Sequence, residues 1–311
     1  MMTKKLLPER SIGKSGGDLF SKPKDLTVIM IPFERFSSVP KAVDRLYRSI
    51  DVPFNLIVIE GNSPESVRHS LEKRRRRHNN ITIIYSEHQV SIGSAINLAT
   101  PHLNTPYAFI MDADVRVPRA SMPHMLRCAK DNQHGIVCPD NYVVPHEIDI
   151  RSDEGILGRK IIKSFGVRTC FLISQEAIQK LGKFDEIMTP CTAGIDIRMA
   201  ADACGVSVCT DAAMSMESDQ EEQLIWPIDA SFHSFQWNQE RVNQSFENLE
   251  KKWGISLRMQ DYSVWLNQKK QDLNESRSFL FLWTWLASKL KSQAYRRQTA
   301  RSEGYYFSKV A

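Results

Sequence analysis

Short apolar runs alternate with amphipathic stretches along the first third of the chain. The runs at 26–31, 55–59, 81–85 and 107–111 are rich in β-branched and aromatic residues, which predicts strands buried on both faces. Between them, apolar residues recur at helical spacing after Pro40 and at 65–78 and 92–99. Strand and helix in strict alternation predict a mostly parallel sheet that is flanked by helices.

The alternation loosens beyond residue 115. Strands are predicted at 170–174 and 206–210, and helices at 175–181, 195–204 and 237–253. An apolar stretch at 279–290 precedes a basic tail. We therefore expect a loose N-terminal arm at 1–24, an α/β domain at 25–235 whose first half ends near 115, and a helical extension at 236–311.

Composition and charge narrow the classes of protein. The chain has 311 residues, is 42% hydrophobic and carries a formal net charge of +5. The excess positive charge lies mainly at 73–77 and 289–301, so it describes local surfaces and predicts no nucleic-acid partner. The N-terminal residues form no secretory signal, and no run of eighteen apolar residues occurs. These features predict a cytoplasmic protein.

The six cysteines are scattered and show no Cys-x-x-Cys spacing. Because this spacing is absent, the sequence predicts no zinc site. Most of them stand in apolar stretches, where cysteine behaves as a small hydrophobic residue. We therefore expect free thiols in a reducing compartment.

Two carboxylates follow the fourth predicted strand, in the segment FIMDADVRV. In parallel sheets, ligands bind beyond the carboxyl ends of the strands, so Asp112 and Asp114 are expected to face a crevice. Paired carboxylates suit Mg²⁺ or Mn²⁺, which prefer oxygen ligands and bind phosphates. The alternative is that the pair only makes a turn, as aspartate often does.

Five motifs occur in one order: TVIMIPFERF, VIEGNS, VSIGSAINLA, YAFIMDADV and FLISQEAIQKLGKFDE. Together the chain resembles a GT-A glycosyltransferase of the family 2 type over about residues 26 to 210. The resemblance implies a Rossmann-like α/β fold with a donor half at 25–115 and an acceptor half at 116–235. It also implies transfer of a sugar, expected to be a hexose, from a UDP- or GDP-sugar to an acceptor hydroxyl.

The resemblance carries over to individual positions. In this family the first two strand ends hold the nucleoside, and the third motif flanks the diphosphate. Glu60 stands where the family has an aspartate that bonds a pyrimidine ring, so the base stays open. The residues expected beside the donor are Pro32, Phe33, Glu34, Glu60, Gly93, Ser94, Asn97, Asp112 and Ala113.

Metal binding and acceptor activation follow from the same match. Asp112 and Asp114 are expected to bind Mn²⁺ or Mg²⁺, with His233 as a further ligand. Inverting relatives take the acceptor proton with a Glu-Asp pair, but here that pair falls on Ala193 and Gly194. Asp196 is the nearest carboxylate, at the start of the predicted helix, where the helix dipole favours its charged form. We predict that Asp196 is the base.

Several alternatives stay open. Inverting transfer is favoured, but a retaining reaction or an inactive protein that only binds a nucleotide sugar also fits the missing pair. A nucleotidyltransferase usually has a glycine-rich loop after its first strand. The corresponding segment IPFERFSSVP contains no glycine, which disfavours that class. The acceptor could be a glycan, lipid, peptide or small molecule. Residues 279–301 could dock on the domain, contact a membrane peripherally, or form a homodimer.

Overall fold

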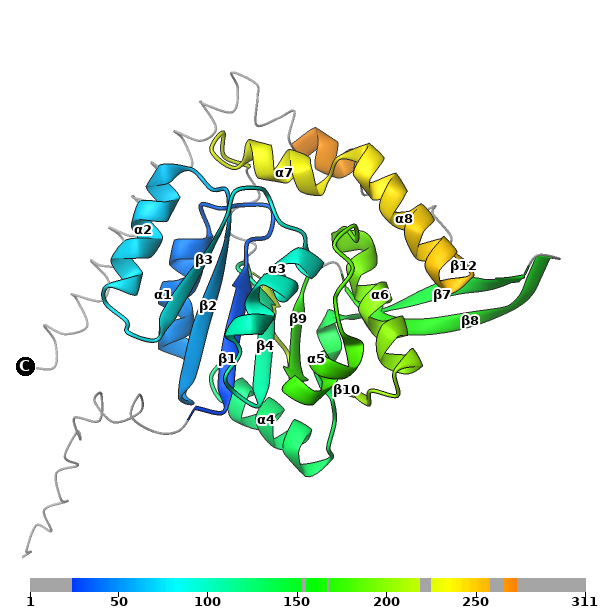
Figure 1. Cartoon of the computed structure of the whole chain (residues 1–311), viewed down its shortest axis with the longest axis horizontal. Coiled ribbons are helices and arrows are strands. Elements are labelled where there is room, and N and C mark those ends of the chain that lie inside the picture. Colours follow the sequence, from blue (N-terminus) through cyan, green and yellow to red (C-terminus); the bar gives the residue numbers. More distant parts are fainter. Residues whose placement is uncertain (1–23, 153–154, 167, 219–224, 258–265, 273–311) are drawn as a thin grey trace, which may run out of the picture.

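The computed structural model describes residues 24–152, 155–166, 168–218, 225–257 and 266–272 (Figure 1). The predicted arm up to residue 23 and the apolar segment with its basic tail at 279–301 lie outside these residues. The division of the chain into an arm, an α/β domain and an extension stays a prediction.

A seven-stranded sheet forms the centre of the molecule, in the order β10-β6-β9-β4-β1-β2-β3. Its strands are β1 (Leu26–Ile31), β2 (Phe54–Gly61), β3 (Ile81–Ser86), β4 (Tyr107–Asp112), β6 (Ile136–Pro139), β9 (Cys170–Ser174) and β10 (Val208–Asp211). β9 runs antiparallel to β4 and β6, and the other neighbours are parallel. Every residue of β1 is buried, as expected for a strand covered on both faces. The α/β fold class predicted from the sequence is confirmed.

Helices flank this sheet (Figure 1). They are α1 (Val39–Ser49), α2 (Glu65–Arg75), α3 (Ile92–Ala99), α4 (Ser121–Asp131), α5 (Gln175–Leu181), α6 (Pro190–Ala203), α7 (Ala230–Gln236) and α8 (Gln239–Trp253), with short 3₁₀ turns at Thr100–His102 and Asp140–Tyr142. Their ends follow local chemistry. The Asn238 side chain accepts from Arg241 N and caps the start of α8, and Gly254 in the left-handed region ends it.

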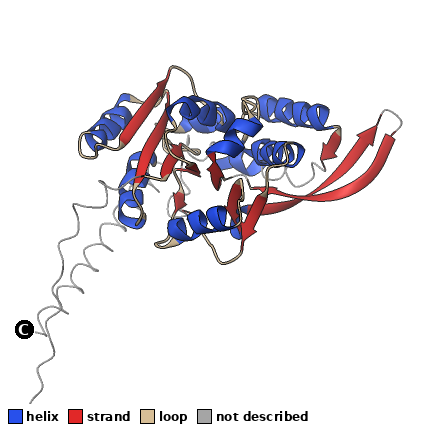
Figure 2. Ribbon diagram, turned by 60° about the horizontal axis from the view of Figure 1, so that its bottom comes forward, coloured by secondary structure: helices blue, strands red, loops and turns tan. Residues whose placement is uncertain are grey.

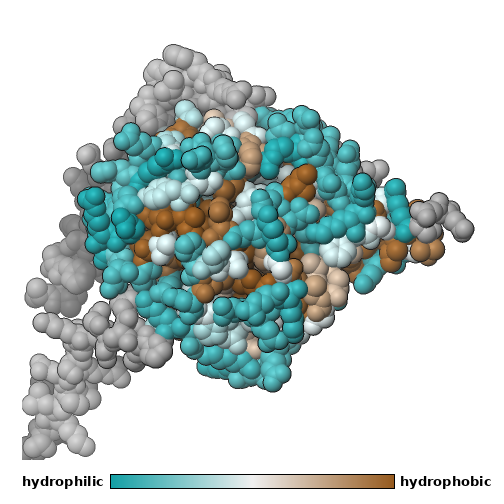
Figure 3. All heavy atoms as spheres, in the orientation of Figure 1, coloured by the Kyte–Doolittle hydropathy of each residue, from teal (hydrophilic) through white to brown (hydrophobic). Residues whose placement is uncertain are grey.

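Two small antiparallel sheets complete the structure. One pairs β5 (Val115–Arg116) with β11 (Glu217–Ser218). The other joins β7 (Val143–Ser152) and β8 (Gly155–Phe165) to β12 (Ile255–Leu257). The β7–β8 hairpin extends away from the body (Figure 2). It carries exposed apolar side chains, with Leu157 73% and Ile161 64% exposed (Figure 3).

Several element boundaries differ from the sequence prediction, and α2, predicted at 65–78, ends at Arg75. Helix α6 begins at Pro190 rather than near 195, because proline fits the first helical turn and the Thr189 amide donates to Thr192 Oγ1 over 3.1 Å. Asp196 therefore lies in the middle of the helix. The prediction that the dipole at the helix start favours its charged form is wrong. The predicted helix at 237–253 begins at Gln239, and the strand predicted at 206–210 spans Val208–Asp211. Among the helices of the described ranges, none combines the length and the hydrophobicity of a membrane-spanning segment.

Candidate functional site

The candidate site lies at the carboxyl ends of β1 and β4, which are neighbouring parallel strands. Ile31 pairs with Asp112 in their register, and Ala113 N donates to Ile31 O over 2.8 Å. The segment 112–114 therefore lies directly beside residues 32–34. This is the edge where a parallel sheet exposes its ligand-binding loops.

Both aspartates are buried and each uses only one carboxylate oxygen. Asp112 Oδ2 accepts from the Thr169 amide over 2.6 Å, and Asp114 Oδ2 accepts from Arg168 Nε over 2.6 Å. The Oδ1 atom of each residue is buried without a hydrogen-bond partner among the described residues. Buried carboxylate oxygens normally have partners, so two acceptor atoms are left available for a ligand.

The protonation of the pair is shifted by its surroundings. Burial raises the pKa of Asp112 well above its usual range, and the neighbouring Asp114 charge raises it further. Burial also raises the pKa of Asp114, whereas the Arg168 guanidinium opposes that rise. A cation bound at the two carboxylates would favour their charged forms, so it would compete with protons for this site.

His233 on α7 is a second buried group without a hydrogen-bond partner. Its side chain is 1% exposed, and neither ring nitrogen is bonded within the described part of the chain. Burial lowers its pKa to about 4, although the nearby Glu34 charge acts in the opposite direction. The imidazole is therefore neutral near pH 7 and has a nitrogen lone pair to offer.

The predicted metal ligands do not form a compact three-residue set. In the described ranges, the side chains that bring three ligand atoms within 4.8 Å of one another are those of Cys128, His134 and Cys209. Two carboxylates with free oxygens still fit a hard cation such as Mg²⁺ or Mn²⁺, because such ions complete their shell with water and phosphate oxygens. The role of His233 as a metal ligand stays a prediction.

A cavity of about 400 Å³ opens beside residues 33 and 34. The Arg168 guanidinium lies 5.6 Å from the centre of the Phe33 ring, and Lys269 Nζ lies 2.6 Å from Glu34 Oε1. The cavity is lined by Phe33, Glu34, Asn141, Tyr142, Val144, Gly166, Arg168, Met216, Ser218 and Lys269. It therefore combines an aromatic ring with two cationic side chains, and such cations can contact phosphate oxygens.

Glu34 is held in an unusual conformation at this cavity. Its φ of 56° lies in the left-handed region, which is uncommon for a residue other than glycine. Its amide donates to Gln236 Oε1 over 2.8 Å, and its Oε1 accepts from Trp237 Nε1 over 3.0 Å. The end of α7 thus fixes the direction of the loop after β1, where Pro32 and Phe33 are buried.

Glu60, at the end of β2, is engaged within its own loop. Its Oε1 accepts from the Ser63 amide, and its Oε2 lies 3.3 Å from Arg68 Nε. The side chain is 2% exposed. These contacts stabilise the β2–α2 loop, and the contact of Glu60 with a base stays a prediction.

The three residues predicted to flank the diphosphate lie on α3 and pack against the segment 184–186. Asn97 Oδ1 accepts from Phe184 N over 2.9 Å, and its Nδ2 donates to Phe184 O over 2.9 Å. A Cβ atom at Gly93 would overlap the carbonyl oxygen of Asp185. Ser94 N donates to the Ser91 side chain, which caps the helix. These contacts account for the residue types without a ligand, and diphosphate contact stays a prediction.

Asp196 lies on α6 and contacts α8. It is 5% exposed, its Oδ1 accepts from Trp253 Nε1 over 2.8 Å, and Lys252 Nζ lies at 2.8 Å. Two residues earlier on α6, a Cβ atom at Gly194 would overlap the carbonyl oxygen of Phe165, where β8 ends. The backbone of β8 therefore leaves no room for a side chain at Gly194, one of the two positions on which the resemblance places the Glu-Asp pair.

Sequence reasoning missed the two cations of the cavity. Arg168 lies two residues before β9, the antiparallel strand. Lys269 comes from the C-terminal segment at 266–272. Neither belongs to a recognisable motif. Only the pairing of β9 with β4 brings Arg168 to Asp114.

Comparison with known proteins gives one match. The family model described as Glycosyl transferase family 2 matches residues 27–182. No curated protein matches the chain. The matched range includes both aspartates, Arg168 and α5. It does not include His233, Trp237 or Lys269.

Proposed function

The chain belongs to glycosyl transferase family 2, and from that premise we propose that it transfers a hexose from a UDP- or GDP-sugar, with Mn²⁺ or Mg²⁺ held at Asp112 and Asp114. The family supports glycosyl transfer and implies a nucleotide-sugar donor and an acceptor. The donor's base and sugar, the metal and the stereochemical course are proposals.

One observation carries this proposal. Asp112 Oδ1 and Asp114 Oδ1 are buried polar atoms without partners, and they lie at the strand end where a parallel sheet binds ligands. A divalent cation bound there would offset negative charge on the departing diphosphate. His233 is proposed as an additional ligand because both of its buried ring nitrogens lack partners.

The cavity supports binding of the donor by the chain's own residues. Arg168 and Lys269 supply positive charge for the diphosphate, which the α3 motif itself lacks. Phe33 offers an aromatic surface beside the cavity, and Glu34 offers an acceptor for ribose or base. Pro32, Glu60, Ala113, Gly93, Ser94 and Asn97 complete the proposed donor contacts.

Asp196 remains the proposed base for inverting transfer, although it must exchange its contacts with Lys252 and Trp253 to meet an acceptor hydroxyl. Those contacts and the occupied position at Gly194 favour a second candidate function. In that alternative the chain binds a nucleotide sugar without transferring it. The acceptor, peripheral membrane contact through 279–301, a homodimer and a cytoplasmic location stay predictions.

Donor binding and turnover test the proposal together. We expect UDP- or GDP-sugars with Mn²⁺ to raise the thermal midpoint of the full chain, and the release of nucleotide to report transfer or hydrolysis. Asp112→Asn and Asp114→Asn should each lower turnover by about 100-fold or more, because charge stabilisation of that size is typical of such groups. Asp51→Asn, at an exposed position, is the matched control.

The outcomes separate the two functions. Turnover that is unchanged in both aspartate variants would contradict the metal site. Donor binding without nucleotide release, across UDP- and GDP-sugars with glycan, lipid and peptide acceptors, would favour the binding protein. Asp196→Asn should lower turnover and leave donor affinity unchanged if Asp196 is the base.

A further inference from the structure

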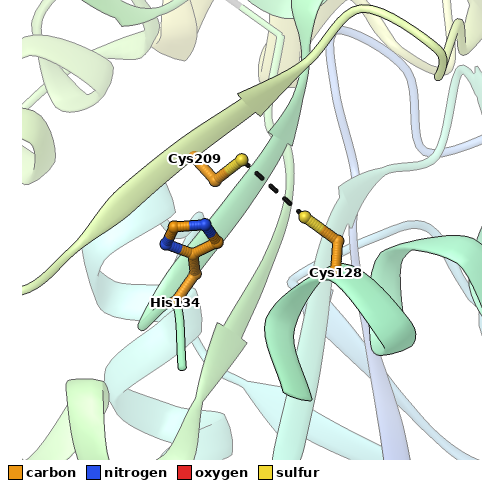
Figure 4. A group of neighbouring side chains, drawn as sticks. All are labelled: Cys128, His134 and Cys209. Atoms are coloured by element: carbon orange, nitrogen blue, oxygen red, sulfur yellow. Dashed lines mark hydrogen bonds between the residues drawn. The ribbon is translucent and has the colours of Figure 1, made fainter. Parts of the chain in front are cut away.

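A cluster of soft ligand atoms lies between α4 and the edge strand β10. Cys128 on α4 and Cys209 on β10 place their sulfur atoms 3.7 Å apart, although 81 residues separate them in sequence. His134, after the end of α4, lies beside both (Figure 4). The ligand atoms of these three residues all lie within 4.8 Å of one another, and all three side chains are half-buried.

The histidine is oriented by a neighbour. His134 Nδ1 lies 2.8 Å from Ser207 Oγ, and the other ring nitrogen faces the two sulfurs (Figure 4). Metal-binding histidines commonly donate one ring N–H to a second group, which leaves the other nitrogen as the ligand. The serine contact is the arrangement that such a ligand requires.

A second polar contact joins α4 to β10 close to the cysteines in sequence. His124 lies one helical turn before Cys128, and Asp211 lies two residues after Cys209 on the same face of the strand. His124 Nε2 and Asp211 Oδ2 are 2.7 Å apart. Two polar contacts, His124 with Asp211 and His134 with Ser207, therefore join residues near the cysteine pair.

The sulfur separation distinguishes two kinds of chemistry. Two zinc–sulfur bonds of about 2.3 Å at a tetrahedral angle place the sulfurs roughly 3.8 Å apart, which is close to the 3.7 Å between Cys128 and Cys209. A disulfide would require them to approach to about 2.05 Å. The two thiols are within hydrogen-bond distance of each other, and the same separation suits two ligands of one ion (Figure 4).

We propose that Cys128, Cys209 and His134 form a binding site for Zn²⁺, with water at the fourth position. Two thiolates and an imidazole are ligands of the type that zinc prefers. On binding, the two thiols lose their protons to solvent, and the imidazole binds through Nε2 as a neutral ligand. No Cys-x-x-Cys spacing announces this site, because one cysteine comes from a helix and the other from a strand far along the chain.

The zinc site is separate from the site at Asp112 and Asp114. Strand β10 lies at the edge of the sheet, and β6 and β9 intervene between it and β4. The two sites also differ in ligand chemistry, because one offers carboxylate oxygen and the other sulfur and nitrogen. Zinc at the cysteine cluster would join α4 to β10, a four-residue strand whose sheet partner is β6.

Cobalt and zinc titrations of the full chain, kept reduced with a non-chelating reductant, test the site. We expect one equivalent of Co²⁺ to produce the near-ultraviolet absorption of a thiolate-to-cobalt charge transfer, and Zn²⁺ to abolish it. Carboxylate ligands at Asp112 and Asp114 cannot produce that band. Cys128→Ser and Cys209→Ser should remove it, and His134→Gln should weaken Co²⁺ affinity about 10-fold or more.

Cys204→Ser is the matched control, since Cys204 is an exposed cysteine at the end of α6. It should keep the full absorption. A hundredfold excess of free Zn²⁺ over Kd should raise the thermal midpoint by about 4 °C for a chain of this size, and the Cys209→Ser variant should not respond.

The proposal has clear contrary results. A reduced full chain with titratable thiols and no charge-transfer band would overturn it, whether or not the variants fold. So would a band that disappears equally in Cys204→Ser. A disulfide between Cys128 and Cys209 that persists in reductant and blocks Zn²⁺ binding would replace the metal site with a covalent link.

Discussion

At the scale of single residues, Arg168 compensates the buried charge of Asp114. The carboxylate side chain is 4% exposed and the guanidinium side chain 41%, with 2.6 Å between Nε and Oδ2. Removing one partner of a buried pair leaves an uncompensated charge. We expect Arg168→Gln to lower the free energy of unfolding by about 2–3 kcal/mol, measured by urea denaturation, and to weaken donor binding because a cation leaves the cavity.

Arg159→Gln is the control for that variant. Arg159 pairs with Asp149 over 3.1 Å but is 65% exposed on the hairpin, and exposed pairs contribute about 0–1 kcal/mol. Equal losses in the two variants would show that burial of Asp114 does not make its ion pair special.

His233 should make stability depend on pH. Burial lowers its pKa from 6.5 to about 4 in the folded chain. Between these values the unfolded chain binds a proton that the folded chain does not, so the free energy of unfolding decreases as the pH falls. The contribution is fully present above about pH 6.5, and about 3 kcal/mol is lost by pH 4.

Burial raises the pKa of Asp112 and Asp114, so these residues change the free energy of unfolding with pH in the opposite direction. Comparing the slope of His233→Gln with that of the unaltered chain isolates the contribution of the histidine. Urea midpoints between pH 4 and 7 should fall less steeply in His233→Gln than in the unaltered chain. His88→Gln, at an exposed position, should retain the original slope. Parallel curves for His233→Gln and the unaltered chain would refute the burial of a neutral imidazole.

At the scale of elements, the sequence predicts those helices and strands whose burial requires a recognisable pattern of apolar residues. β1 and β9 have the predicted bounds because each is an apolar run. α3 and α5 do because each begins after a serine cap. The β7–β8 hairpin was missed, because it stands away from the body and alternates charged with aliphatic residues instead of forming an apolar run. Arg168 was missed for a related reason: an antiparallel pairing between distant strands leaves no local pattern.

The contact between α6 and β8 yields an element-scale prediction. A Cβ atom at Gly194 would overlap Phe165 O, whereas one at Gly158 on β8 meets no atom within 4 Å. Gly194→Ala should therefore cost about 2 kcal/mol of stability or more through overpacking, seen in the urea midpoint. Gly158→Ala is the matched control and should be nearly neutral. If Gly194→Ala were as stable as the control, β8 would not close the position of the family's base.

The candidate site is a property of the whole molecule. The family match ends at residue 182, but Gln236 and Trp237 bond Glu34, and Lys269 reaches the same carboxylate. The first strand end is therefore completed by residues more than 200 positions later. Sequence motifs locate the donor half, and they are silent on these later contacts because each depends on how the C-terminal segments cross the sheet edge.

Lys269 tests whether that late segment takes part in donor binding. Its Nζ lies 2.6 Å from Glu34 and lines the cavity, whereas the adjacent Lys270 is exposed and bonds Gln239 Oε1. Loss of one charge-assisted contact of about 1.5 kcal/mol corresponds to roughly a tenfold weaker donor. Calorimetric titration of UDP- and GDP-sugars should show this for Lys269→Ala and no change for Lys270→Ala. Tighter binding in Lys269→Ala would instead mean that the lysine covers Glu34 and keeps the donor out, so that the C-terminal segment limits access to the site rather than completing it.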